Sequence, residues 1–248
     1  MNDQNHVFIT GGNKGLGRHI ALKFAREGSH VFINYNSDDE KARETKEMIE
    51  EEGGNITLLK ADIGNTKQLK EMLGRLPAID IFIHNAVYAK TAKVESIEDN
   101  DWEKSMAVNV TPLVKISRHL FYSMKEKQFG RIFAISSIGS TRAIPGYMNV
   151  GVAKAAEEAV IRYMAAEWGP YGITANVVSP GAMDTEAFRA VFQDKADLRL
   201  EQAAKRTPAK RIISFDEVAD VIYHYSHPAF SMATGQNIRM DGGAHLLS

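Results

Sequence analysis

The chain has no cysteine and almost no net charge, and it lacks any long apolar run. Without cysteine, disulfides, a thiolate nucleophile and cysteine-ligated metals are excluded. A formal net charge of −1 gives no reason to expect nucleic acid or an anionic membrane as a partner. The first six residues are polar, and the eight histidines lack the spacing of metal ligands. These absences predict a cytoplasmic protein with no metal site and no nucleic-acid or membrane partner.

Short apolar segments alternate with longer segments of helical pattern over all 248 residues, and no linker or repeat interrupts them. The apolar segments predict strands over 7–10, 30–34, 56–61, 79–83, 131–135, 173–178 and 237–241. Helices are expected between them, including 38–52, 65–76, 155–168 and 215–226. This alternation predicts an α/β fold with a doubly wound, largely parallel sheet of the Rossmann type flanked by helices, in a single domain over 1–248.

A glycine loop follows the first expected strand and opens a helix that runs to Glu27. Backbone N–H groups at such a helix N-terminus point at phosphates, and glycine lets the backbone approach them closely. The alternative is a glycine-rich turn without a ligand. The loop residues expected to bind a dinucleotide are Gly11, Asn13, Lys14, Gly15, Leu16 and Gly17.

The end of the second strand bears on the choice of dinucleotide. In NAD-binding proteins of this architecture, an acidic residue at this place holds the ribose hydroxyls. Here the place is taken by Tyr35, with Asn36 and Ser37 next. No carboxylate at that position repels a 2′-phosphate, and Lys14 can pair with one. These residues favour NADPH over NADH, although two aspartates that follow directly count against it.

Two polar residues farther along the chain need an explanation. Asp62 follows the third strand, where it either accepts a hydrogen bond from an adenine amino group or caps the next helix, the commoner role. Asn109 lies inside a helical segment, where asparagine is mildly unfavourable unless its side chain has a specific partner.

A polar segment that ends at Lys154 connects the strand over 131–135 to the helix over 155–168. Tyr147 and Lys154 are two helical turns apart, so they share nearly one face if the helix reaches back to Tyr147. Together with the Ser137 hydroxyl they indicate proton transfer to an oxygen at the edge of the sheet where open α/β folds bind ligands. The alternative is a serine-rich turn with an incidental surface tyrosine and lysine.

The motifs of this chain, and the order in which they follow one another, resemble those of the short-chain dehydrogenase/reductase superfamily over essentially the whole chain. The resemblance rests on 10–17, Asp62, Asn85 and Ala86, Asn109 and Val110, Ser136 and Ser137, Lys154, and 180–185. It implies a catalytic set of Ser137, Tyr147, Lys154 and Asn109, in which Asn109 supports Lys154. It also implies a homotetramer and further cofactor contacts from Ile63, Asn85, Ala86, Lys154, Pro180, Gly181 and Thr185, the last holding the carboxamide.

The chain departs from the family pattern in two places. The family usually reads NNAG after the fourth strand, whereas this chain has His84, Asn85, Ala86 and Val87. The family's catalytic tyrosine stands four residues before the lysine, and that position is Val150. The resulting Tyr-x6-Lys spacing, with Tyr147, is similar to that of enoyl-acyl-carrier-protein reductases, and the surrounding residues most resemble their type III class of bacilli.

The shifted tyrosine has a physical rationale. When an enoyl thioester is reduced, hydride adds to the β-carbon while negative charge collects on the thioester oxygen, roughly 2–3 Å farther from the nicotinamide than in carbonyl reduction. A donor must lie about 3 Å from that oxygen, so it has to move outward as well. Because a helix rises roughly 10 Å from Tyr147 to Lys154, Tyr147 must lean inward from an irregular helix start, which Gly146 permits.

The expected function is therefore NADPH-dependent reduction of the carbon–carbon double bond of a trans-2-enoyl thioester, carried by an acyl-carrier protein or coenzyme A. The segment 186–213 is expected to close over the acyl chain, with Phe188, Val191, Phe192, Leu198 and Leu200 lining it. Seven basic and three acidic residues between Arg189 and Arg211 form either a docking surface for an acidic carrier protein or a solvated lid. Two other functions stay open: reduction of another keto or enoyl substrate, and dinucleotide binding without catalysis.

Overall fold

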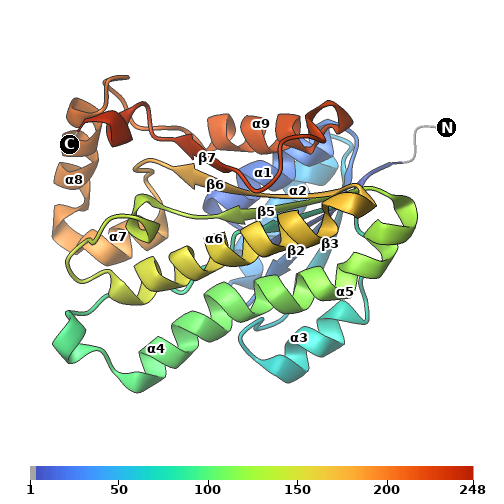
Figure 1. Ribbon diagram of the computed structural model, residues 1–248, viewed down its shortest axis with the longest axis horizontal. Helices are drawn as coiled ribbons and strands as arrows, with labels where there is room; N and C mark the ends of the chain where they lie inside the picture. The colour runs from blue at the N-terminus through green and yellow to red at the C-terminus, as the bar shows by residue number, and fades with distance from the viewer. Residues whose placement is uncertain (1–3, 248) are drawn as a thin grey trace.

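The computed structural model describes residues 4–247 and contains one seven-stranded sheet between two layers of helices (Figure 1). Every pairing is parallel, in the order β3-β2-β1-β4-β5-β6-β7. The strand order reverses between β1 and β4, and such a switch point leaves a crevice at the carboxyl ends of the strands. The strands are β1 (His6–Thr10), β2 (His30–Tyr35), β3 (Asn55–Lys60), β4 (Ile81–His84), β5 (Gly130–Ile135), β6 (Ile173–Pro180) and β7 (Asn237–Met240). The predicted doubly wound α/β fold is confirmed.

Each face of the sheet is covered by its own helices. One face packs against α1 (Gly15–Arg26), α2 (Asp39–Glu51) and α9 (Phe215–Ser226). The other packs against α3 (Thr66–Leu73), α5 (Thr111–Lys127) and α6 (Met148–Trp168), and a π-helical turn, Met106–Val110, joins α4 (Asp99–Ser105) to α5. The remaining helices, α7 (Glu186–Phe192) and α8 (Ala196–Arg206), lie together at one end of the sheet (Figure 1).

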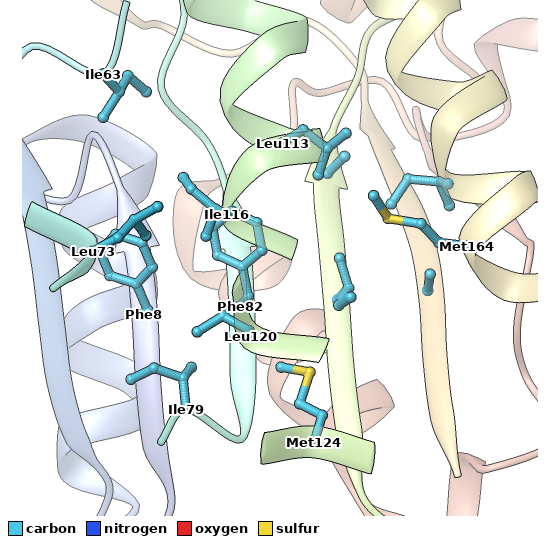
Figure 2. Packing of buried hydrophobic residues seen from close by; sticks show 14 of the residues in the cluster. Phe8, Ile63, Leu73, Ile79, Phe82, Leu113, Ile116, Leu120, Met124 and Met164 are labelled. Carbon is cyan, nitrogen blue, oxygen red and sulfur yellow. The ribbon is translucent and has the colours of Figure 1, made fainter. Parts of the chain in front are cut away.

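Alternate strand residues fill the two sides of the core. Phe8 and Phe82 stack with ring centroids 5.6 Å apart on the side of α5, where Leu113 and Ile116 cover them (Figure 2). Val7, Ile9, Ile33 and their neighbours form the core under α1 and α9. Burial of both faces explains why the strands read as continuous apolar runs rather than as alternating patterns.

Helix boundaries differ from the expected ones in three places. Helix α6 begins at Met148, seven residues before the expected start, with Tyr147 as its N-cap. Helix α3 ends at Leu73 rather than at residue 76, and the segment expected over 186–213 divides into α7 and α8 at a 3-10 turn. Among the residues that the structure describes, no helix combines the length and the apolar character that a bilayer crossing requires.

Candidate functional site

A cavity of about 770 Å³ opens at the carboxyl ends of the strands, beside the switch point between β1 and β4. Loops that follow six strands contribute to its wall, together with α7. The predicted site residues that line it are Gly11, Asn13, Lys14, Gly15, Leu16, Tyr35, Asn36, Ser37, Asp62, Ile63, Asn85, Ala86, Ser137, Tyr147, Lys154, Pro180, Gly181 and Thr185. Gly17 and Asn109 were predicted for the site but are not part of this wall.

The glycine loop has the shape of an anion cradle. Gly11 and Gly15 adopt positive φ angles of 65° and 50°, which side chains other than glycine disfavour. A Cβ atom on Gly15 would meet nothing within 4 Å, so this part of the wall leaves room for phosphate groups. Asn85 braces the loop, because its Nδ2 donates to the carbonyl oxygens of Thr10 (3.1 Å) and Gly11 (2.9 Å).

Gly17 has a packing role behind the cradle. A Cβ atom on it would lie 2.1 Å from the carbonyl oxygen of Gly11 and 2.7 Å from Nδ2 of Asn85. Only glycine lets α1 approach the loop this closely. Gly17 therefore supports the cradle from behind and does not face the cavity.

The end of the cavity beside β2 contains two further basic residues, both close to Glu44, whose Oε2 lies 2.9 Å from Nη2 of Arg18 and 3.9 Å from Nζ of Lys41. Arg18 and Lys41 line it in addition to Lys14. Lys14 forms an ion pair with Glu186 at the start of α7, and its Nζ lies 3.8 Å from Asp38. The signal for Arg18 and Lys41 was available, because they stand in the first turns of the two helices that follow β1 and β2.

The expected capping role of Asp62 is wrong. Asn65 caps α3, since its side chain accepts from the backbone N–H groups of Lys67 and Gln68. Oδ1 of Asp62 accepts from the N–H of Gly64 (2.9 Å), and the residue lines the cavity. The turn that Asp62 stabilises leads into the cap, which explains why the two positions were confused.

Tyr147 reaches the cavity from an irregular helix start. Gly146 adopts φ 80°, and Tyr147 follows it as the N-cap of α6, in agreement with the geometry expected from the sequence. The Tyr147 ring packs on Gly139, and Ser137 and Lys154 line the same cavity. Val150, at the position of the family's usual tyrosine, is fully buried in the core and does not line the cavity.

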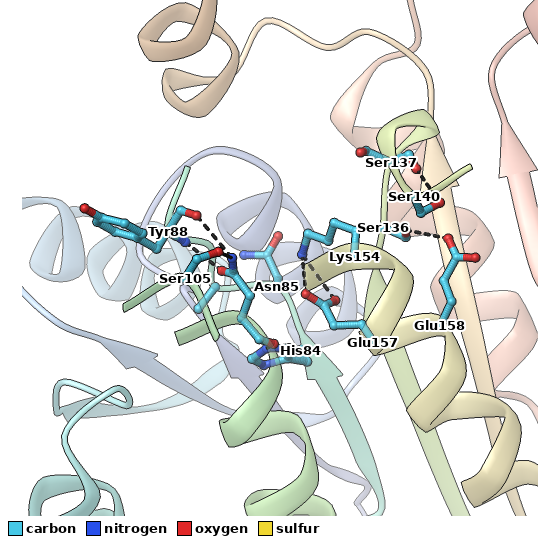
Figure 3. A network of polar contacts seen from close by, with 12 residues as sticks. His84, Asn85, Tyr88, Ser105, Ser136, Ser137, Ser140, Lys154, Glu157 and Glu158 are labelled. Carbon is cyan, nitrogen blue, oxygen red and sulfur yellow. Dashed lines mark hydrogen bonds and ion pairs between the residues drawn. The ribbon is translucent and has the colours of Figure 1, made fainter. Parts of the chain in front are cut away.

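Lys154 is held by a carboxylate that the sequence analysis did not identify. Its Nζ lies 2.8 Å from Oε1 and 3.2 Å from Oε2 of Glu157, and both side chains are buried (Figure 3). Burial raises the pKa of Glu157 to about 7, although the Lys154 ammonium opposes the shift. The next residue, Glu158, accepts a hydrogen bond of 2.7 Å from the Ser136 hydroxyl.

The hydrogen bonds of Asn109 in the described structure go to residues other than Lys154, so its expected support of Lys154 stays a prediction. Oδ1 of Asn109 accepts from the N–H of Tyr88 (2.8 Å), and its Nδ2 donates to the Tyr88 carbonyl oxygen and the Ser105 hydroxyl (both 3.1 Å). Its carbonyl oxygen lies 2.6 Å from Nε2 of His84. These partners explain why an asparagine is tolerated inside this helical segment: it ties β4 and the following loop to the π-helical turn.

The lid segment contributes only part of its apolar residues to the cavity. Phe188, Val191 and Phe192 of α7 line it. Leu198 is 53% exposed, and Leu200 is buried on another side of α8, so the expectation that both line an acyl chain is wrong. Other apolar residues that line the cavity include Ile138, Ile144, Met183 and Phe215.

Three of the seven basic residues of the lid are paired with acids. Arg189 pairs with Asp184, Lys205 with Glu201, and Arg211 with Glu217. Since Asp184 and Glu217 lie outside the counted segment, the local excess of positive charge is smaller than the sequence count indicated. This pairing weakens the argument for a carrier-protein docking surface there.

Comparisons with known proteins agree with this geometry. A family model described as enoyl-(acyl carrier protein) reductase matches residues 11–245. The chain is 33% identical to a 1-cyclohexenylcarbonyl-CoA reductase of Streptomyces collinus, over 97% of this chain and 86% of that protein. It is 26% identical to the 3-oxoacyl-[acyl-carrier-protein] reductase FabG of Staphylococcus epidermidis, over 97% of this chain and 98% of that protein. A gluconate 5-dehydrogenase from Burkholderia cenocepacia, solved with NADP and tartrate, superposes with a TM-score of 0.89 at 29% identity, covering 99% of this chain and 97% of that one.

Proposed function

The chain belongs to the short-chain dehydrogenase/reductase superfamily, and we propose that it reduces the carbon–carbon double bond of a 2-enoyl thioester with NADPH. An oxidoreductase activity follows from the family; the type of bond reduced is the proposal. The observation that carries it is the position of Tyr147 at the N-cap of α6, with Val150 buried where a carbonyl reductase of this family has its phenol.

Tyr147 is the phenol suited to act on the substrate. Two other tyrosines line the cavity, but the Tyr35 hydroxyl donates to Asp39 (3.0 Å) and the Tyr88 hydroxyl to Asp101 (2.7 Å). Among the described residues, the Tyr147 hydroxyl has no such acceptor within the chain. We infer that it donates a hydrogen bond, and a proton, to the thioester oxygen on which charge develops.

Ser137 and Lys154 complete the site. The Ser137 oxygen accepts from the N–H of Gly139 (3.2 Å), which leaves its hydrogen free to point into the cavity. The Lys154 ammonium places a positive charge in a buried wall, where it favours negative charge on the reacting oxygen and can donate to ribose hydroxyls. NADPH, when bound along the glycine loop, supplies the hydride.

NADPH is favoured by the basic residues Lys14 and Lys41 at the β2 end of the cavity, beside Arg18, whose guanidinium is paired with Glu44. The Glu186 partner of Lys14 is exposed, so a 2′-phosphate can compete for the lysine at little cost. The adenine contact of Asp62 and the carboxamide contact of Thr185 belong to this proposal. We also propose that the chain forms a single domain in which 186–213 is a lid, and that it assembles as a homotetramer.

The substrate class is supported by one relative in particular. The name 1-cyclohexenylcarbonyl-CoA denotes a thioester whose carbonyl is attached to a ring carbon–carbon double bond, and that relative is 33% identical to this chain. The apolar wall around Phe188, Val191 and Phe192 suits the hydrocarbon part of such a substrate. Since Arg189 and Arg211, two of the four lid arginines, are paired with acids, we treat the coenzyme A thioester and the carrier-linked thioester as equal candidates.

Reduction of a keto group is the second candidate, favoured by the similarity to 3-oxoacyl-[acyl-carrier-protein] reductases and to an acetoacetyl-CoA reductase of Rhizobium meliloti at 28% identity. Oxidation of NADPH with crotonyl-CoA, beside acetoacetyl-CoA and beside NADH, separates the two. We expect turnover of the enoyl thioester at least tenfold above that of the keto thioester. The reverse ratio would contradict the proposal, and binding of NADPH without turnover of either would indicate a non-catalytic protein.

A further inference from the structure

The Lys154 ammonium makes its closest contacts within the chain to a single carboxylate. Glu157 stands one helical turn later on α6, and its two oxygens lie 2.8 and 3.2 Å from Nζ. Lys154 is 5% exposed and Glu157 is fully buried, so water does not screen the pair. The carboxylate contacts the ammonium group from within the same helix (Figure 3), and Lys154 also lines the cavity.

The other polar groups near this pair have partners of their own. The side chain of Asn109 bonds to Tyr88 and Ser105, and its carbonyl oxygen accepts from Nε2 of His84. The Nδ1 atom of His84 lies 3.1 Å from the Thr10 hydroxyl, which also accepts from two backbone N–H groups and therefore donates to the imidazole. Both nitrogens of His84 are thus satisfied in the neutral form, and Glu157 is the group that remains for Lys154.

We propose that Glu157 is a positioning residue for the reaction proposed above: its carboxylate fixes the Lys154 ammonium at the cavity wall and sets the net charge that Lys154 presents there. With Glu157 ionised, the pair is neutral overall. With Glu157 protonated, the ammonium charge acts on the cavity undiminished. The inference rests on the proposed function only for the use of that charge, not for the pairing itself.

The surroundings place the switch between these states near neutral pH. Burial raises the pKa of Glu157 to about 7; the charge of Glu158 raises it further, and Lys154 lowers it. On β4, the neighbouring titratable group is His84. Burial lowers the pKa of His84 to about 3, so the imidazole stays neutral near pH 7. The charge state of the Lys154–Glu157 pair therefore changes in the range in which enzymes of this kind operate.

The test compares Glu157→Gln with wild type and with Glu167→Gln, a change of the same kind at an exposed position of α6. Turnover at saturating NADPH and crotonyl-CoA is followed from about pH 5.5 to 8.5. We expect wild type and the control to lose turnover several-fold as pH rises through about 7, since ionised Glu157 cancels the ammonium charge. The side-chain oxygen of glutamine has the same reach and still accepts from the Lys154 ammonium, but it carries no charge. Glu157→Gln should therefore show, at every pH, the turnover that wild type has at low pH, with an NADPH dissociation constant within about threefold of wild type. Persistence of the transition in Glu157→Gln would overturn the inference.

Two further measurements do not depend on Glu157→Gln, and the first of them needs no substrate. In wild type saturated with NADP⁺, the ¹³C resonance of the Glu157 carboxyl, assigned by its loss in a Glu157 variant, should titrate near pH 7, well above exposed glutamates. Glu157→Asp keeps the charge but withdraws it by one methylene, so it should retain the pH transition and lose about tenfold in turnover. The inference would be contradicted if the Glu157 carboxyl titrated at the same pH as the exposed glutamates, or if Glu157→Asp had full turnover. A neutral titration in a protein that does not reduce crotonyl-CoA would instead refute the proposed reaction alone.

Discussion

The aromatic ring of Tyr147 lies directly against Gly139. A Cβ atom on Gly139 would be 2.5 Å from Cε1 and 2.6 Å from Cδ1 of the ring, closer than any carbon contact tolerates. Gly151, one turn into α6, lies behind the same edge of the ring, where a Cβ atom would be 3.7 Å from Cδ1. The ring of the proposed proton donor therefore occupies space that only a glycine at position 139 leaves open, whereas Gly151 lets α6 approach the Gly139 carbonyl oxygen, which would lie 2.7 Å from a Cβ atom there.

Gly139→Ala should displace the Tyr147 ring. Because a misplacement of about 1 Å in a catalytic group can cost up to a hundredfold, we expect turnover to fall about tenfold to a hundredfold while NADPH binding changes little. Gly74→Ala is the matched control, since Gly74 has an ordinary helical φ of −66° and its nearest neighbouring atom would be 3.6 Å from the new methyl group. Steady-state kinetics and fluorescence titration with NADPH measure both effects. Equal turnover in the two variants would show that the ring position is not critical.

Tyr147→Phe removes the hydroxyl and retains the ring packing on Gly139. A general acid contributes typically 10²–10⁴-fold, so turnover of the enoyl thioester should fall by about that factor. The NADPH dissociation constant should stay within about twofold. Tyr163→Phe, at an exposed position of the same helix, controls for the loss of a phenol as such. Unchanged turnover in Tyr147→Phe would refute the assignment of the proton donor.

Lys14→Gln tests the choice of dinucleotide. Loss of one charge-assisted contact with a 2′-phosphate should raise the dissociation constant for NADPH about tenfold, which corresponds to about 1.4 kcal/mol, and leave that for NADH unchanged. Lys46→Gln on α2 removes an exposed positive charge away from the cavity and should affect neither. An equal loss for both cofactors in Lys14→Gln would assign the lysine to the shared pyrophosphate instead.

The sequence was sufficient to predict the fold because its signals are local and repeated. Apolar runs such as 7–10 and 79–83 fit strands buried on both faces, and glycines or capping residues mark the ends of helices. The alternation of strands and helices predicts a parallel sheet, but the order of its strands requires the structure. Boundaries were less certain: the early start of α6 depends on the positive φ of Gly146, which no periodicity reveals.

The sequence was sufficient to predict which residues lie together at the strand ends, but not the contacts across the fold. Gly11, Asn85, Ser137 and their neighbours share one edge of the sheet because parallel strands all end there. The pairing of Glu157 with Lys154 was not predicted, because an adjacent pair of glutamates in a helix looks like a solvated face until burial is known. His84 was noted as a departure from the family pattern, but its bond to the Asn109 carbonyl oxygen requires the three-dimensional structure.

Asp62 and Asn65 have separable roles that one pair of variants distinguishes. Asn65→Ala removes the cap of α3 and should lower the free energy of unfolding by about 1 kcal/mol, with no effect on NADPH binding. Asp62→Asn keeps an acceptor for the Gly64 N–H, so stability should change little, while a contact with adenine would be weakened and the NADPH dissociation constant should rise a few-fold. Urea denaturation and fluorescence titration measure the two quantities. The assignment would be reversed if Asn65→Ala bound NADPH more weakly than wild type and Asp62→Asn bound it equally well.

His84→Gln should remove a source of acid instability. Burial, helped by the nearby Lys154 charge, lowers the pKa of His84 to about 3 in the folded state, whereas the unfolded chain has the ordinary value near 6.5. Below about pH 6.5 the unfolded chain therefore binds one more proton at this residue than the folded protein, and the free energy of unfolding falls as pH falls, by about 1.4 kcal/mol per pH unit. Glu157 acts in the opposite sense between about pH 4.5 and 7, because its raised pKa makes the folded protein bind the additional proton there. The difference between variant and wild type isolates the histidine.

The glutamine amide can donate to the Asn109 carbonyl oxygen in place of Nε2, so the variant keeps the buried hydrogen bond and loses the titration. We expect the free energy of unfolding of His84→Gln, relative to wild type, to rise by about 2 kcal/mol between pH 6.5 and pH 5, measured by urea denaturation at each pH. His119→Gln, at an exposed position of α5, should follow wild type throughout. If the difference between His84→Gln and wild type does not depend on pH, the imidazole is not held neutral. In that case the hydrogen bonds to Thr10 and Asn109 cannot be what fixes its protonation.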